Sequence, residues 1–227
     1  MTPWILLDTT QVPGNGGELR LYRRGDEFSI MIVGHGELMN SRVHASEDAL
    51  ADYTCARLVN GASPRLLIGG LGMGFTLAAA LRQVGEQARV EVAELVPAVV
   101  KWNKGELGIK AGHPLDDPRV VVREGDVARM IRQEQQAFDA ILLDVDNGPE
   151  GLTHKKNDWL YGMEGLNAAY TALRPKGVLA IWSAGPDQAF EQRLRKIGFH
   201  VERVRVHAHG SKGGKHVIWF AKRTISS

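Results

Sequence analysis

The sequence has few of the features that mark secreted, membrane-embedded or nucleic-acid-binding proteins. Cys55 is its only cysteine, which excludes an intrachain disulfide and favours a reducing compartment. No stretch approaches the ~20 apolar residues of a membrane-spanning helix, and the segment from Met1 to Asp8 does not resemble a signal peptide. The formal net charge is only +2, so the composition requires no polyanionic partner. We therefore expect a cytoplasmic protein without nucleic-acid or membrane partners.

The remaining composition is that of an ordinary globular protein. The 227 residues are 44% hydrophobic and 24% charged, which is sufficient for one substantial core. Basic residues gather in the last third of the chain, and we interpret them as a solvated face, because charge runs usually are. The histidines show no paired metal-ligand spacing, so we expect no bound metal.

The first 40 residues are predicted to form a small antiparallel β region. Apolar and polar residues alternate over 18–22 and 27–33, and a turn at 24–26 separates the two segments. An apolar stripe over 41–59 then predicts a helix. We place the boundary of an N-terminal β-hairpin region (1–40) here, and assign 41–227 to a nucleoside-binding catalytic domain.

From Arg65 onward, predicted strands alternate with predicted helices. The strands are 66–68, 89–93, 119–122, 138–143 and 178–181, and the helices are 76–84, 97–104, 158–173 and 188–196. This alternation predicts an α/β fold with a mostly parallel sheet. Two further strands, 201–206 and 216–220, are too close together for a helical crossover, so we expect an antiparallel pair at the C-terminal edge. A parallel sheet with such an edge is the Rossmann-like, methyltransferase-type arrangement.

The most informative segment runs from Ile68 to Gly74, between the first parallel strand and its helix. Its glycines Gly70, Gly72 and Gly74 would let the backbone approach a ligand beside the free N–H groups of a helix N-terminus. The alternative reading of these glycines is a tight turn.

Acidic residues follow the next strands. Glu94 ends the second strand, where a carboxylate can accept hydrogen bonds from both hydroxyls of a ribose, although exposed acids are also common there. The pair Gly125-Asp126 follows the third strand, and Asp126 is either an acceptor for an adenine amino group or a helix N-cap, two compatible roles. The carboxyl ends of parallel strands meet at one edge of a sheet, so these residues predict an adenosine-containing ligand there.

With these motifs, the chain resembles the spermidine synthase family from about Gly36 to Ile181. The segment 68–74 resembles that family's glycine loop, Glu94 matches its ribose-binding acid, and Gly125-Asp126 matches its adenine-site pair. The segment 138–144 matches its fourth strand and the catalytic aspartate, here Asp144. The resemblance implies a homodimer that transfers an aminopropyl group from decarboxylated S-adenosylmethionine to an amine acceptor.

Two positions depart from the family pattern. Gly72 stands where the family has an aspartate that pairs with the terminal amine of the donor. Asn147 stands where the family has an acid that holds the cationic acceptor, and the adjacent Asp146 is a candidate to replace it. We assign Asp146, Asn147 and Trp159 to the acceptor site.

The implied chemistry is displacement at a carbon beside a sulfonium. The protein must align the two substrates and keep an amine acceptor unprotonated, and Asp144 is the candidate to orient or deprotonate it. The alternative for Asp144 is a turn-forming residue before Gly148-Pro149.

Two other functions remain open. The first is methyl transfer to a small substrate from intact S-adenosylmethionine, whose carboxylate an acid at position 72 would repel. The second is a non-catalytic nucleoside-binding module, which would retain the binding residues without the chemistry.

Overall fold

The N-terminal region forms an antiparallel sheet. The computed structural model describes residues 2–14, 16–59, 63–145, 158–209 and 212–224. The strands of this sheet, in spatial and chain order, are β1 (Ile5–Gln11), β2 (Glu18–Arg24), β3 (Glu27–Ile32) and β4 (Gly36–Asn40). The predicted antiparallel β region is confirmed. Strand β4 was not predicted, because its glycine start has the composition of a turn and its register with β3 is irregular.

The second sheet has seven strands in the order β10-β11-β9-β8-β5-β6-β7. They are β5 (Arg65–Gly69), β6 (Arg89–Glu94), β7 (Val120–Glu124), β8 (Phe138–Leu143), β9 (Leu173–Ser183), β10 (Phe199–His209) and β11 (Lys212–Arg223). Strands β5 to β9 pair in parallel, whereas β11 is antiparallel to both of its neighbours. The predicted fold class, with its antiparallel C-terminal edge, is therefore confirmed.

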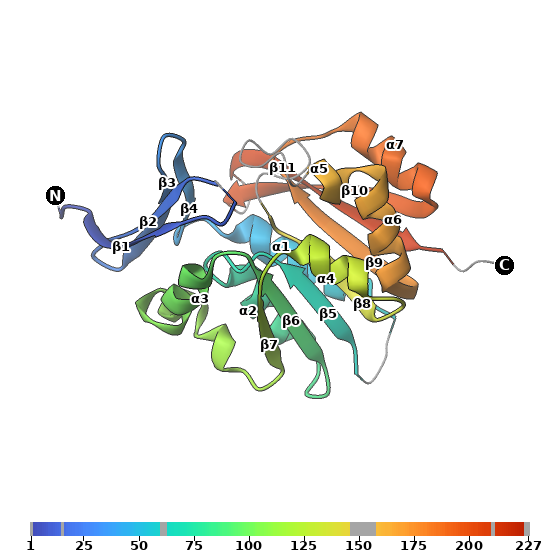
Figure 1. Cartoon of the computed structure of the whole chain (residues 1–227), viewed down its shortest axis with the longest axis horizontal. Coiled ribbons are helices and arrows are strands. Elements are labelled where there is room, and N and C mark those ends of the chain that lie inside the picture. The colour runs from blue at the N-terminus through green and yellow to red at the C-terminus, as the bar shows by residue number, and fades with distance from the viewer. Residues whose placement is uncertain (1, 15, 60–62, 146–157, 210–211, 225–227) are drawn as a thin grey trace.

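Helices cover both faces of the large sheet (Figure 1). One face carries α1 (Ala45–Cys55), α2 (Phe75–Gln83) and α3 (Pro97–Lys104), and the other carries α4 (Val127–Gln133), α5 (Asp158–Tyr161), α6 (Met163–Ala172) and α7 (Gln188–Ile197). Short 3₁₀ turns, η1 (Glu106–Ala111) and η2 (Pro114–Asp116), follow α3. In the described part of the chain, no helix has the length and apolar character needed to cross a membrane.

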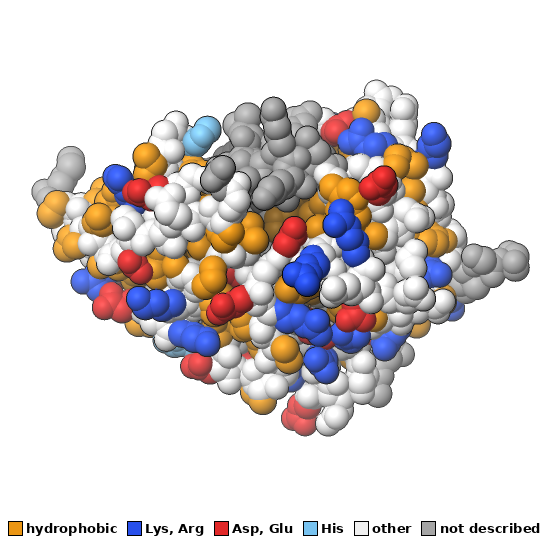
Figure 2. Space-filling view, in the orientation of Figure 1, with side chains coloured by type: hydrophobic (Ala, Val, Ile, Leu, Met, Phe, Trp, Pro, Cys, Tyr) orange, Lys and Arg blue, Asp and Glu red, His pale blue; other side chains and the backbone are white. Residues whose placement is uncertain are grey.

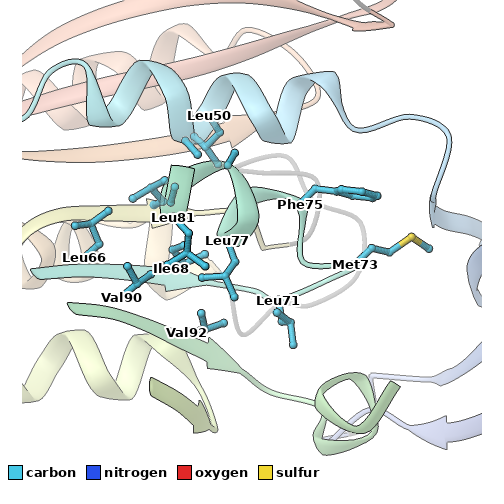
Figure 3. Packing of buried hydrophobic residues seen from close by; sticks show 14 of the residues in the cluster. Leu50, Leu66, Ile68, Leu71, Met73, Phe75, Leu77, Leu81, Val90 and Val92 are labelled. Carbon is cyan, nitrogen blue, oxygen red and sulfur yellow. The ribbon is translucent and has the colours of Figure 1, made fainter. Parts of the chain in front are cut away.

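Alternation along the parallel strands divides their side chains between two apolar layers. Leu66 and Ile68 of β5 pack with Leu77 of α2 and Leu50 of α1, as Figure 3 shows, whereas Leu67 joins the layer under α4 to α7. Buried residues of the N-terminal sheet belong to the same layer as Leu50: Leu19, Leu21, Phe28, Ile30 and Ile32. The two sheets thus share one core, and the division of the chain at residue 40 stays a prediction.

Removing Leu50 should destabilise this shared core. Its side chain is fully buried, so Leu50→Ala should lower the free energy of unfolding by ~2–5 kcal/mol through lost contacts and a residual cavity. The matched control is Ile109→Ala, because Ile109 is 63% exposed. Equilibrium unfolding in urea measures both variants, and equal destabilisation would contradict the packing described.

Candidate functional site

A cavity of about 380 Å³ lies between the N-terminal sheet and the carboxyl ends of the parallel strands. Its volume is within the range of small-molecule sites, and it adjoins the point between β5 and β8 where the strand order reverses, which is where such sheets bind ligands. The N-terminal sheet contributes an apolar wall that includes Ile30, Leu38 and Met39. Most of the predicted site residues line the opposite wall: Gly70, Gly72, Glu94, Gly125, Asp126 and Asp144.

Backbone hydrogen bonds fix the strand ends at one level. The amide of Gly70 donates to the carbonyl of Ala93 (2.8 Å), and the amide of Gly125 donates to the carbonyl of Glu94 (2.8 Å). On the other side of β5, the amide of Asp144 donates to the carbonyl of Gly69 (3.0 Å). The loops after four neighbouring strands therefore leave the sheet side by side, which brings residues far apart in the sequence to one cavity.

The glycine loop needs its glycines. Gly70 has a φ of +89°, and a Cβ atom there would collide with the carbonyl oxygen of Asp144. Gly72 has a φ of +53°, and its carbonyl accepts a hydrogen bond from the buried Asn103 side chain (Nδ2 to O, 2.8 Å). Gly74 is the left-handed N-cap of α2 and is not among the described residues that line the cavity. Gly74 shapes the start of α2, and its predicted contact with the ligand stays a prediction.

Glu94 is almost fully buried and organises the loop. Its Oε2 accepts a hydrogen bond from the amide of Leu71 (2.9 Å), and its Oε1 accepts one from the amide of Val96 (2.8 Å). Burial raises the pKa of the Glu94 carboxyl, while these backbone donors act in the opposite direction. Each carboxylate oxygen has a second lone pair, so both can still accept a ribose hydroxyl.

Asp126 occupies the position predicted for both of its roles. Its Oδ1 accepts a hydrogen bond from the amide of Ala128 (2.8 Å), which confirms the N-cap of α4. The same residue lines the cavity. Its contact with an adenine amino group stays a prediction.

Asp144 lies at the end of β8, where two hollows meet. Its Oδ2 accepts a hydrogen bond from the hydroxyl of Thr76 (2.7 Å). A smaller hollow of about 40 Å³ is lined by Asp144, Thr76, Gly72 and Glu47 of α1. Burial, and then the nearby charge of Glu47, raise the pKa of Asp144 to about 7, while Thr76 lowers it. A carboxyl that titrates near neutrality suits a group that exchanges a proton with an amine.

Sequence reasoning missed Glu47, Thr76 and Asn103 as members of the site. Glu47 and Asp48 are adjacent acids in the first turn of α1, where the helix dipole alone would favour them. Only the packing of α1 on the sheet separates them, because Glu47 faces Asp144 whereas Asp48 pairs with His44 (2.7 Å). No pattern in the sequence distinguishes the two.

Of the predicted acceptor residues, Trp159 is the one that lies among the described residues. Asp146 and Asn147 lie outside the described residues. Trp159 donates from Nε1 to Glu164 (2.9 Å), and the Arg132 guanidinium lies 3.6 Å from its ring centroid. Trp159 is not among the described residues that line either hollow. Its role in acceptor binding stays a prediction. Within the described ranges, no three His, Cys, Asp or Glu residues are placed to hold a metal ion.

The fold and the cavity define a class: Rossmann-like α/β proteins whose strand ends carry a glycine loop and acids suited to a nucleoside. No family model matches the chain. A curated relative, polyamine aminopropyltransferase 1 of Streptomyces coelicolor, is 29% identical over 138 residues, which cover 56% of this chain and 24% of the relative. The chain thus spans about a quarter of the length of that relative.

Comparison with solved structures shows that the fold resembles that of the spermidine synthases. The spermidine synthase of Thermotoga maritima is 20% identical with a TM-score of 0.76, over 97% of this chain and 74% of that one. A spermidine synthase in complex with the transition state analogue AdoDATO is also 20% identical, with a TM-score of 0.75, over 97% of this chain and 73% of that one. A probable spermidine synthase from Corynebacterium glutamicum is 16% identical with a TM-score of 0.65, over 98% and 81%. The fold is that of the spermidine synthases, and the resemblance to that family is confirmed.

Gly70→Ala should damage the cavity. The added methyl group would meet the backbone of Asp144 in a left-handed conformation that itself costs about 1 kcal/mol. We expect weaker binding of methylthioadenosine by calorimetry, together with a lower melting temperature. In the control Gly85→Ala, nothing lies within 4 Å of the new Cβ, and both properties should stay near those of the natural protein. Unchanged nucleoside affinity in Gly70→Ala would contradict the site.

Glu94→Ala should weaken binding of the same nucleoside by at least ~30-fold, because two charge-assisted hydrogen bonds are worth ~2–4 kcal/mol. Glu124 provides a matched control, since it pairs in register with Glu94 at the end of β7 but is exposed and outside the cavity-lining set. Glu124→Ala should bind normally. Equal affinities in the two folded variants would remove Glu94 from the site.

Proposed function

We propose that the chain is a spermidine synthase-like transferase that binds an S-adenosylmethionine-type nucleoside and transfers an aminopropyl group to an amine acceptor. The observation that carries the proposal is that Glu94, Asp126 and Asp144, from the ends of three strands, line one cavity with the glycine loop. The curated relative is named as a polyamine aminopropyltransferase, and the solved neighbours are named as spermidine synthases, which supports the same reaction.

The cavity offers a consistent place for each part of the donor. In this proposal the ribose hydroxyls bind Glu94, and the adenine lies beside Asp126 against apolar residues such as Leu95 and Val127. The sulfonium end then points toward Asp144, where the smaller hollow begins. The apolar wall from the N-terminal sheet excludes water from the reacting atoms, which strengthens electrostatic interactions there.

The proposed reaction needs the acceptor nitrogen aligned with the aminopropyl carbon of the donor, and one group that accepts a proton. The lone pair of the acceptor nitrogen forms a bond to the aminopropyl carbon next to the sulfonium, and the carbon–sulfur bond breaks. The bonding pair moves to sulfur, which leaves the neutral thioether methylthioadenosine. The nitrogen loses a proton, and Asp144, with a pKa of about 7, is placed to accept it.

A second candidate, methyl transfer from intact S-adenosylmethionine, is favoured by one observation. Gly72 contributes no charge to the loop, so nothing at that position repels the donor's carboxylate or attracts its amine. The non-catalytic alternative is disfavoured, because binding alone does not require Asp144 beside a second carboxyl.

The donor preference separates the two transferases, and Gly72→Asp tests it. Asp is tolerated at the left-handed φ of +53°, and the new Cβ would lie 3.1 Å from Sδ of the flexible Met39 side chain, so the substitution can be accommodated. One unit-charge contact in such a cleft is worth roughly 1–4 kcal/mol. Without it, selectivity for the decarboxylated donor should be reduced or reversed by ~10-fold or more, and Gly72→Asp should restore it.

Calorimetric titration with S-adenosylmethionine and its decarboxylated form, in both proteins, measures this preference. If the natural protein already prefers the decarboxylated donor strongly, and Gly72→Asp adds nothing, another group replaces the missing acid and aminopropyl transfer is favoured. A natural preference for the intact donor would instead favour methyl transfer.

A homodimer and a cytoplasmic location are part of the same proposal. Exposed apolar side chains gather at the end of the molecule that holds the N-terminal sheet (Figure 2). Ile5 and Leu6 on the edge strand β1 are 49% and 48% exposed. A second copy that covers this strand would bury them, which supports the dimer that the family resemblance implies.

A further inference from the structure

Thr76 holds the carboxylate of Asp144 from the start of α2. Its side chain is 3% exposed, and Oγ1 donates a hydrogen bond of 2.7 Å to Oδ2 of Asp144. A β-branched side chain in a helix has few χ1 choices, and burial restricts them further, so the direction of this hydroxyl is fixed. The contact occupies one acceptor site of Oδ2, whereas Oδ1 of Asp144 accepts no hydrogen bond from the described residues, so Oδ1 is the less occupied oxygen for a substrate.

The charges around Asp144 are all of one sign in the described part of the chain. Glu47 of α1 faces the smaller hollow, and Glu94 and Asp126 line the larger one. No Lys, Arg or His is among the described residues that line either hollow. Without a cation beside it, the ionised form of Asp144 depends on neutral donors, and Thr76 is the described side chain that supplies one.

We propose that Thr76 is a positioning residue for the proposed reaction: its hydroxyl holds one oxygen of Asp144, turns the other toward the acceptor amine, and keeps the carboxylate ready to take a proton, while Glu47 acts in the opposite sense. This proposal rests on the proposed function for its consequence in catalysis. The contact between Thr76 and Asp144 itself does not depend on that function.

Thr76 and Glu47 should shift the pKa of Asp144 in opposite directions. A hydrogen bond donated to a carboxylate stabilises the charged form, whereas a second carboxylate nearby destabilises it. Burial and Glu47 raise the pKa of Asp144, and Thr76 lowers it. Loss of the hydroxyl should therefore raise the pKa further, and loss of the Glu47 charge should lower it.

Three variants test these signs. Thr76→Val keeps the shape of the side chain and removes the donor, and it should raise the pKa of Asp144 by about one unit, which is tenfold in proton affinity. Thr76→Ser restores the hydroxyl and should return the value close to the natural one. Glu47→Gln should move it by a similar amount in the other direction.

Two independent readouts follow the titration. The first is the ¹³C chemical shift of the Asp144 carboxyl in labelled protein, assigned by its loss in Asp144→Asn. The second is the pH profile of kcat/KM for aminopropyl transfer. An ionised Asp144 is active as a base, so activity falls as the pH drops through its pKa. The acidic limb should therefore move up in Thr76→Val and down in Glu47→Gln, and kcat should change more than KM.

Thr54→Val is the matched control. Thr54 is also a fully buried helical threonine, and its hydroxyl donates to the carbonyl of Leu50 (2.6 Å) instead of to a carboxylate. The control loses the same atoms from the same type of environment. It should change stability without moving the titration of Asp144.

The possible results distinguish a failure of the Thr76 proposal from a failure of the proposed function. An unshifted or lowered pKa in folded Thr76→Val, or an equal shift in Thr54→Val, would overturn the proposal. If Thr76→Val does not fold, Thr76→Ala against Thr76→Ser makes the same comparison. A shifted carboxyl titration in a protein with no transferase activity would overturn the proposed function and leave the role of Thr76 toward Asp144 standing.

Discussion

The carboxylate of Glu94 is the interaction on which the geometry of the site depends. A buried charge is tolerated only when it is hydrogen-bonded, and Glu94 meets this condition with one backbone amide on each side. Leu71 belongs to the glycine loop and Val96 to the loop after β6, so one side chain joins the two. A ligand that binds Glu94 therefore also contacts the side chain that holds the glycine loop in place.

The close approach of the loop to Asp144 follows from the same constraint. With Glu94 holding Leu71, Gly70 is pressed against the backbone of Asp144, where no side chain fits. The candidate base is then placed by its own backbone and by Thr76, while α1 brings Glu47 to the smaller hollow that Asp144 and Thr76 also line. The proton affinity of Asp144 is thus set by three elements that meet at this point, and not by the local sequence alone.

The N-terminal sheet completes the cavity that the large sheet begins. It supplies apolar residues such as Ile30 and Met39, and its own buried side chains merge with the core under α1 and α2. Because the N-terminal sheet shares this apolar layer with α1, α2 and β5, a change in its buried residues should also affect the walls of the binding cavity.

The sequence predicted what depends on local patterns and missed what depends on packing. The bounds of α3 and β8 agree with the predicted 97–104 and 138–143, because α3 begins with a proline and β8 is apolar except for Asp139. The antiparallel edge pair was also predicted from its short connection. The predicted helix 158–173 is instead divided at Gly162, and Leu173 already belongs to β9.

Site residues at strand ends could be predicted because parallel strands carry them to one edge, as for Gly70, Glu94 and Asp126. Strand order could not, because it depends on pairings between distant segments. Glu47 could not be told from Asp48 for the same reason, since only tertiary packing turns one of them toward Asp144.

A crystal structure with bound methylthioadenosine tests the central claim most directly. We predict that the nucleoside lies in the cavity between the two sheets, with both ribose hydroxyls within hydrogen-bonding distance of Glu94. We also predict that the adenine lies beside Asp126 and that the sulfur lies on the side of Asp144. A nucleoside bound elsewhere, or in this cavity with its ribose turned away from Glu94, would contradict this claim.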